Sequence, residues 1–208
     1  MKPTPIRAAV VSAALATMLT TAGAATATAQ AFPTPDHNCV FEGENLNTLL
    51  GVGERLLGPP PCREAFADER WVRTFPSWGT ATGPAGALYP ADYTPARPGP
   101  MDDFTSKLRG VRIVQDIGTH REWSVTAGPE VVRNITLFEG HPFANFASAP
   151  LRPLSLGSHT TTVFMNLSAE HCDGLGEDRV EHCLPAGEFP YTGHARVHSF
   201  PRRPQPAP

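Results

Sequence analysis

The stretch His159-Thr160-Thr161-Thr162-Val163-Phe164-Met165-Asn166-Leu167 decides the fold of this chain. One face of the stretch would carry Thr161, Val163, Met165 and Leu167, and the other would carry Thr160, Thr162, Phe164 and Asn166. Successive side chains of a β-strand point to opposite faces, so a period of two predicts a strand with one buried face. We therefore expect residues 159–167 to form a half-buried strand, with His159 capping a turn at its start.

Short segments rich in β-branched and aromatic residues recur on both sides of this strand. Turn-forming residues separate them, as at Gly118-Thr119-His120 and Gly140-His141-Pro142. Short strands separated by turns are typical of an antiparallel sandwich or barrel, so we predict a mainly β fold with a sandwich domain over residues 101–200. The other predicted strands are residues 111–114, 122–125, 131–138 and 195–200.

Residues 32–100 form a less regular segment in front of this domain. The chain contains 23 prolines, many of them between Pro59 and Pro100, and proline favours loops and extended chain. Leucines at roughly helical spacing predict a short helix over residues 45–57. The remaining expectations are a helical turn over residues 65–71, a long surface crossing over 75–100 and a disordered tail over 201–208.

Two stretches resemble exported proteins. Pro153-Leu154-Ser155-Leu156-Gly157-Ser158-His159-Thr160, followed by the alternating strand, looks like the late part of bacterial immunoglobulin-like domains. Residues 167–187 resemble uncharacterised exported proteins of high-GC Gram-positive bacteria. The resemblance implies an immunoglobulin-like antiparallel sandwich and carries no known activity. The chain departs from antibody-type domains because it lacks their Cys…Trp…Cys pattern.

The first 31 residues have the order of a secretory signal peptide. Lys2 and Arg7 precede an apolar run over residues 8–19, and Ala29-Gln30-Ala31 supplies an A-x-A cleavage site. The apolar run is shorter than the roughly 20 residues of a membrane-spanning helix. We therefore expect a secreted protein that begins at Phe32 and has no membrane anchor after cleavage; the alternative is a helical anchor that stays in place.

The charge of the chain argues against nucleic acid as a partner. The whole chain has 17 Lys and Arg against 20 Asp and Glu, and the signal contains two of these cations and no acid. A mildly acidic chain without a basic stripe is a poor ligand for nucleic acid or anionic membranes.

Four cysteines follow the signal. An even number of cysteines in an exported chain predicts disulfides, and proximity in sequence favours Cys39–Cys62 and Cys172–Cys183. The alternative is a metal site made of thiolates, which an oxidising compartment disfavours.

One constellation offers a candidate metal site. Glu170-His171-Cys172 is echoed by Glu181-His182-Cys183. If the two cysteines face each other across an antiparallel ladder, His171, Asp173 and His182 share one face, and two imidazoles with a carboxylate could hold a divalent metal. The favoured interpretation is that these polar residues lie on a disulfide-stapled surface loop. The adjacent acids Asp102 and Asp103 are likewise expected to form a solvated face or a helix N-cap.

The motifs of common catalytic sites are missing from the sequence. It contains no G-x-S-x-G, no H-E-x-x-H and no phosphate-binding glycine loop, so we predict no catalytic residues and no cofactor. The favoured function is a secreted, non-catalytic binding or structural module for an extracellular protein or glycan. One alternative is a metal-dependent extracellular enzyme that uses His171, Asp173 and His182. Another is a protease inhibitor that presents the loop 173–182.

Overall fold

The structure is a computed structural model that describes residues 38–202. The predicted signal peptide (1–31) and most of the predicted tail (203–208) lie outside these residues. Strands dominate, and the helices are short, so the prediction of a mainly β fold is confirmed. The helices are α1 (Leu46–Leu50), α2 (Pro100–Lys107), α3 (Arg179–His182) and the 3-10 turn η1 (Pro129–Val131).

The larger sheet is built around the strand that the sequence predicts most clearly. Strand β10 (Gly157–Leu167) pairs antiparallel with β6 (Leu108–Gln115) and with β14 (Ala195–Phe200). Its Thr161, Val163, Met165 and Leu167 are all buried, as the alternation predicts. The sheet has the order β4-β14-β10-β6-β7, and β13 also pairs with β10. The added strands are β4 (Glu64–Phe66), β7 (Trp123–Ala127) and β13 (Gly187–Pro190).

The second sheet has the order β3-β5-β9-β8. Its strands are β3 (Arg55–Leu57), β5 (Trp71–Gly79), β8 (Val132–Phe138) and β9 (His141–Ala147). The predicted break at residues 140–142 is only partly correct: the tight turn between β8 and β9 is Glu139–Gly140, and His141 and Pro142 already belong to β9. The sequence analysis missed β9, because its burial follows no period of two and Pro142 lies within it.

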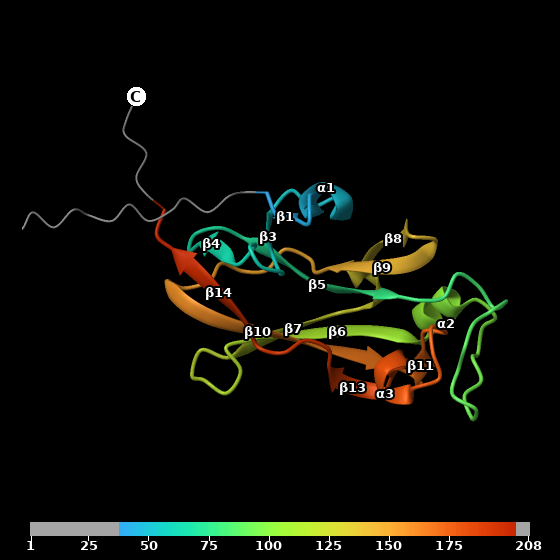
Figure 1. The fold of residues 1–208 in the computed structure, drawn as a ribbon. Helices are drawn as coiled ribbons and strands as arrows, with labels where there is room; N and C mark the ends of the chain where they lie inside the picture. The colour runs from blue at the N-terminus through green and yellow to red at the C-terminus, as the bar shows by residue number, and fades with distance from the viewer. Residues whose placement is uncertain (1–37, 203–208) are drawn as a thin grey trace, which may run out of the picture. The chain divides into compact units, whose positions relative to one another are not determined.

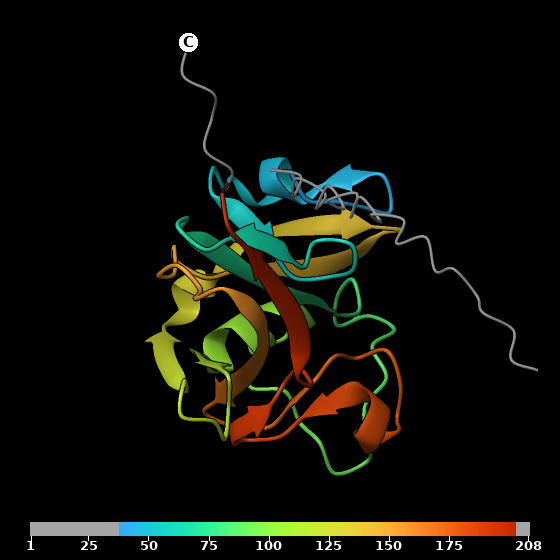
Figure 2. The ribbon, with the colours of Figure 1, turned by 90° about the vertical axis from the view of Figure 1, so that its left-hand side faces the viewer.

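The two sheets lie as two layers with the main apolar core between them (Figures 1 and 2). Trp71, Phe75 and Phe146 enter this core from the smaller sheet, while Ile113 and Met165 enter it from the larger one. A second cluster lies under α1 and contains Cys39, Leu50, Val52, Leu56, Val72 and Ala147.

The segment 32–100 is more regular than predicted. The expected helix over 45–57 is only α1, because Gly51 adopts a left-handed conformation (φ 63°) that ends it. Residues 65–71 form no helical turn; β4 and the start of β5 lie there instead. Strands β3 and β4 pair in parallel with β5 and β14, which departs from a wholly antiparallel fold. The surface crossing predicted for residues 75–100 is wrong for residues 75–79, because these residues belong to strand β5.

Both predicted disulfides are present, Cys39–Cys62 and Cys172–Cys183. The second joins β11 (His171–Cys172) to β12 (Cys183–Leu184), the two short strands of an antiparallel ladder. Cys172 faces Cys183 and His171 faces Leu184, which is the register that the sequence predicts. The first joins the residue before β1 (Val40–Phe41) to the loop before β4; β1 itself pairs with β2 (Glu44–Asn45). No helix within residues 38–202 is long and apolar enough to cross a membrane.

Candidate ligand-binding cavity

The three predicted metal ligands lie in two separate hydrogen-bonded pairs. The Nδ1 atom of His171 lies 2.9 Å from Oδ2 of Asp103, and Nδ1 of His182 lies 3.2 Å from Oδ2 of Asp173. Across residues 38–202, the ligating atoms of His171, Asp173 and His182 do not come together within 4.8 Å. The metal-ligand grouping found in that range combines Glu170 with Cys172 and Cys183, whose sulfurs are already joined.

The prediction that these residues lie on an open surface loop is wrong for His171 and Asp173, which are 0% and 5% exposed. The reason is α2, which packs beside β11 and brings Asp103 under the ladder. His171 also lies against the rings of Trp78 and Phe104. The β11–β12 hairpin therefore covers a buried polar cluster.

Asp103 is the centre of that cluster, and the prediction of a solvated position or N-cap is wrong for it. Its carboxylate accepts hydrogen bonds from the Tyr93 hydroxyl (2.8 Å), the Lys107 ammonium (2.7 Å) and His171. The backbone amides of Ala96 and Arg97 donate to its other oxygen. Burial by itself would raise the pKa of Asp103, but these donors outweigh it and hold the pKa well below its usual range.

The charges of this cluster are balanced internally. Burial lowers the pKa of His171, against the opposing pull of Asp103, so the imidazole is neutral at pH 7. Lys107 also donates to the backbone carbonyl of Glu170. The cluster ties α2 to the hairpin and has the character of a structural network.

A second buried His–Asp pair lies at the start of β10. Nδ1 of His159 is 2.6 Å from Oδ2 of Asp116, while its Nε2 is 2.7 Å from the carbonyl oxygen of Ser155 and 3.4 Å from the Ser155 hydroxyl. These are the residue types of a Ser-His-Asp triad. The shorter Nε2 contact is to a carbonyl, which only accepts, so a hydrogen bond there requires Nε2 to be the donor, and a nitrogen that donates cannot accept the hydroxyl proton. The expectation that His159 caps the turn before β10 fits this contact.

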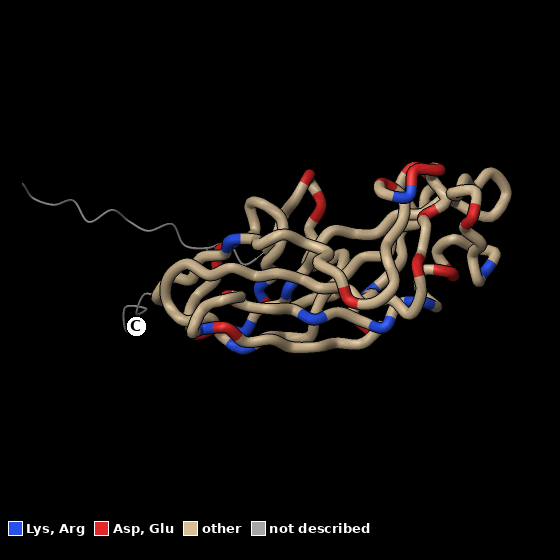
Figure 3. The backbone as a smooth tube through the Cα atoms, turned by 90° about the horizontal axis from the view of Figure 1, so that it is seen from below, with Lys and Arg blue, Asp and Glu red and all other residues tan. Residues whose placement is uncertain are grey.

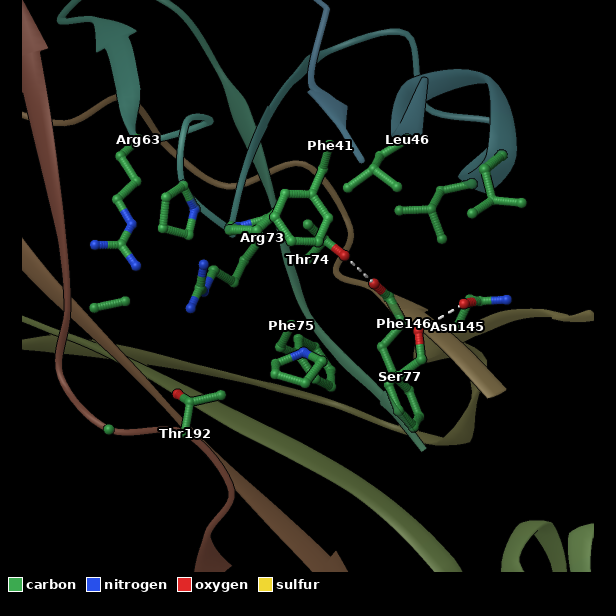
Figure 4. Close-up of a pocket in the computed structure, with 18 of the residues that line it drawn as sticks. Phe41, Leu46, Arg63, Arg73, Thr74, Phe75, Ser77, Asn145, Phe146 and Thr192 are labelled. Atoms are coloured by element: carbon green, nitrogen blue, oxygen red, sulfur yellow. Dashed lines mark hydrogen bonds between the residues drawn. The ribbon is translucent and has the colours of Figure 1, made fainter. Parts of the chain in front are cut away.

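A hollow that contains neither histidine lies elsewhere, beside α1 and β5. It is a cavity of about 650 Å³, within the range of ligand pockets. Figure 4 shows its wall, in which rings and aliphatic side chains face the open space. The lining comes from five parts of the chain: residues 41–50, 58–63, 73–77, 145–146 and 192–195. The apolar lining residues are Phe41, Leu46, Leu49, Leu50, Pro59, Pro60, Phe75, Pro76, Phe146 and Ala195.

Most polar lining groups already have partners within the protein. The Thr74 hydroxyl donates to the Phe146 carbonyl at 2.7 Å, and the Ser77 hydroxyl donates to Oδ1 of Asn145 at 2.6 Å (Figure 4). Nδ1 of His194 lies 2.7 Å from the Thr162 hydroxyl. The wall therefore offers a ligand mainly apolar surface.

Two arginines are the exception. Arg73 lies on β5, on the same face as Trp71 and Phe75, and is 2% exposed. Its Nη1 donates to the Leu57 carbonyl at 3.3 Å. Burial, with a contribution from the charge of Arg63, lowers the pKa of Arg73 to about 10. No Asp or Glu is among the residues that line the cavity.

The sequence analysis did not identify this cavity. Its lining residues are far apart in the chain, so no spacing links them. One signal was visible: Arg73 interrupts the apolar stretch Trp71-Val72-Arg73-Thr74-Phe75, and a cation at a core-facing strand position calls for an explanation.

The molecule so defined is a two-layered, mainly β protein with two disulfides and a large apolar cavity. Comparison of the chain with protein-family models, with curated proteins and with solved structures finds no match. The resemblance to immunoglobulin-like exported proteins therefore stays a prediction.

Proposed function

We propose that this protein is a secreted, non-catalytic binding module that holds a small, largely apolar ligand in the cavity beside α1 and β5. The observation that carries this proposal is the cavity itself, at about 650 Å³ with a mostly apolar lining. Pockets of this size and chemistry are the usual sites for small-molecule ligands. The two disulfides are typical of an oxidising, extracellular compartment, and the signal-like N-terminus supports secretion.

The lining favours an apolar molecule over the glycan or protein partner that the sequence suggested. A glycan carries many hydroxyl groups, each of which loses hydrogen bonds to water on binding and needs a replacement. Thr74, Ser77 and Asn145 already use their polar groups: Thr74 donates to a backbone carbonyl, Ser77 donates to Asn145, and Asn145 donates to the Thr136 hydroxyl. A protein partner would need a broad exposed face, whereas this site is concave.

A non-catalytic role is favoured by the position of the two buried His–Asp pairs away from the cavity, although Nε2 of His171 has no hydrogen-bond partner among residues 38–202. His159 has both ring nitrogens within hydrogen-bond distance of acceptors, and His171 faces aromatic rings beneath the hairpin. Neither residue lines the cavity. The metal-dependent enzyme and the protease inhibitor remain alternative hypotheses without a supporting contact in residues 38–202.

The proposal is tested with a neutral dye whose fluorescence rises in apolar surroundings, such as N-phenylnaphthylamine. The wild-type protein should bind it, and Leu46→Trp, which places an indole in the cavity wall, should weaken binding at least several-fold. Leu137→Trp is the matched control, because Leu137 is 74% exposed and lies outside the cavity. Absence of dye binding to the wild type, or equal binding by both variants, would contradict the proposal.

A further inference from the structure

We infer that Arg63 and Arg73 bind the anionic headgroup of an amphiphile whose apolar tail lies in the cavity. This inference rests on the proposed function and names the chemical class of its ligand. It starts from two guanidinium groups that the fold places at an apolar site without an acid beside them.

Arg73 is a buried cation whose hydrogen bonding is incomplete. The side chain is 2% exposed, and its Nε is buried with no hydrogen-bond partner in residues 38–202. The same holds for Nε of Arg63. No ion pair within the described chain involves either residue, whereas the buried Arg55 meets the carboxylate of Glu69. The buried Arg55 therefore has an acidic partner, whereas Arg63 and Arg73 at the cavity have none among the described residues.

The arrangement is costly without an anion. A buried charge is normally paired and hydrogen-bonded, because the surrounding protein replaces little of its hydration. Here two like charges are close enough for Arg63 to disfavour the charged form of Arg73. An anion beside the two guanidinium groups would offset this repulsion. A guanidinium presents its donors as a planar fork that matches carboxylate and phosphate oxygens.

The rest of the cavity suits a hydrocarbon tail. Figure 4 shows Arg63 and Arg73 to one side of the open space, with Phe41 and Leu46 above it and Phe75 and Phe146 below. These side chains offer an apolar wall. The acids of the described chain are dense at the other end of the molecule, around α3 (Figure 3). A ligand with one anionic end and one apolar end matches both parts of the site.

The headgroup chemistry is that of a small oxyanion, and a carboxylate or a phosphate could supply it. The experiment therefore compares three ligands with the same tail: dodecanoate, dodecyl phosphate and dodecanol. Each is added below the concentration at which it forms micelles, and its affinity is measured by displacement of the neutral dye.

The wild type should bind dodecanoate or dodecyl phosphate about tenfold or more tightly than dodecanol, since hydrogen bonds between charged partners are the stronger ones. The variant Arg63→Met with Arg73→Met should lose that preference and keep its affinity for dodecanol. Arg63→Met alone, at a half-buried loop position, gives a second test if the double variant does not fold. Arg109→Met is the matched control, because Arg109 is exposed and lies outside the lining.

The outcomes separate this inference from the proposed function. Equal affinity of the wild type for all three ligands would overturn the headgroup inference and leave the proposed function standing. A preference for the anions that survives in the double variant would overturn the assignment to these two arginines. Failure of every ligand and of the dye to bind would overturn both.

Discussion

Asp103 shows how much one residue can owe to its tertiary surroundings. Its carboxylate accepts from three side chains and two backbone amides, and it is 0% exposed. His171 reaches it from 68 residues further along the chain. Removing one member of such a network leaves the others buried without partners, which costs more than one hydrogen bond contributes.

The network makes stability depend on pH. The pKa of Asp103 is lower in the folded protein than its unfolded value of about 3.9, so the unfolded chain takes up the proton first. The stability from Asp103 is therefore present above about pH 4 and lost as the pH falls further. The pKa of His171 is also lowered, so its contribution falls as the pH drops below its unfolded value of about 6.5.

We expect the free energy of unfolding to decrease in two stages between pH 7 and pH 3. Asp103→Asn should lower stability by about 3 kcal/mol at pH 7, because it leaves the Lys107 ammonium buried and unpaired, and it should remove the lower stage. Urea unfolding at a series of pH values measures this. Asp102→Asn is the control, since Asp102 is exposed; a similar loss in both variants would show that the cluster is not responsible.

The backbone conformation at position 110 requires glycine. Its φ is +131°, and an added Cβ would lie 2.0 Å from the carbonyl oxygen of Ala127. The position follows a register shift between β6 and β10, where the extra residue of a bulge requires an unusual conformation. Gly110→Ala should cost at least about 2 kcal/mol. Thermal unfolding measures the loss, and Gly83→Ala, whose Cβ would meet no atom within 4 Å, should melt close to the wild type.

At the scale of the element, β10 carries the centre of the larger sheet. Met165 is fully buried between the sheets, while the next residue, Asn166, is exposed. Met165→Asp should cost several kcal/mol, because it buries a charge that has no partner in the core. Asn166→Asp adds the same charge on the solvent face and should change stability by less than about 0.5 kcal/mol. Denaturant midpoints compare the two, and equal midpoints would contradict the burial of this face.

At the scale of the whole molecule, the two disulfides have different relations to the cavity. Cys39–Cys62 joins the chain beside Phe41 to the loop that contains Pro60 and Arg63, so it connects two parts of the cavity wall. Cys172–Cys183 closes the hairpin over Asp103, and no residue of that hairpin lines the cavity. Each bond should contribute about 2–5 kcal/mol to stability.

We expect the paired Cys→Ala variants to differ in ligand binding. Loss of Cys39–Cys62 should weaken binding of the neutral dye at least several-fold, because two walls of the cavity are no longer held together. Loss of Cys172–Cys183 should lower the melting temperature and leave dye affinity at the wild-type value. The dye titration is made well below the melting temperature of each variant. Equal dye affinity in both variants would show that the first disulfide does not shape the cavity.

The sequence by itself determined the features that depend on neighbours along the chain. The period of two in residues 159–167 fixed which face of β10 is buried, since side chains of a strand must alternate. Proximity of the cysteines in sequence favoured the two pairings that the structure contains, and the ladder register assumed for Cys172 and Cys183 is the one observed. The same reasoning failed at β5 and β9. The buried Arg73 in β5 and the buried Pro142 in β9 interrupt the apolar pattern by which a strand is recognised.

Only the tertiary structure decided what each polar side chain meets. Asp103 and Arg73 are both charged residues taken out of water, yet the fold surrounds the first with five donors and leaves the second beside another cation. No local pattern distinguishes them, because the state of a buried charge depends on groups that come from distant parts of the chain. The existence of the cavity likewise depends on distant parts of the chain. Its walls come from segments that are up to about 150 residues apart, and only their packing leaves the space between them open.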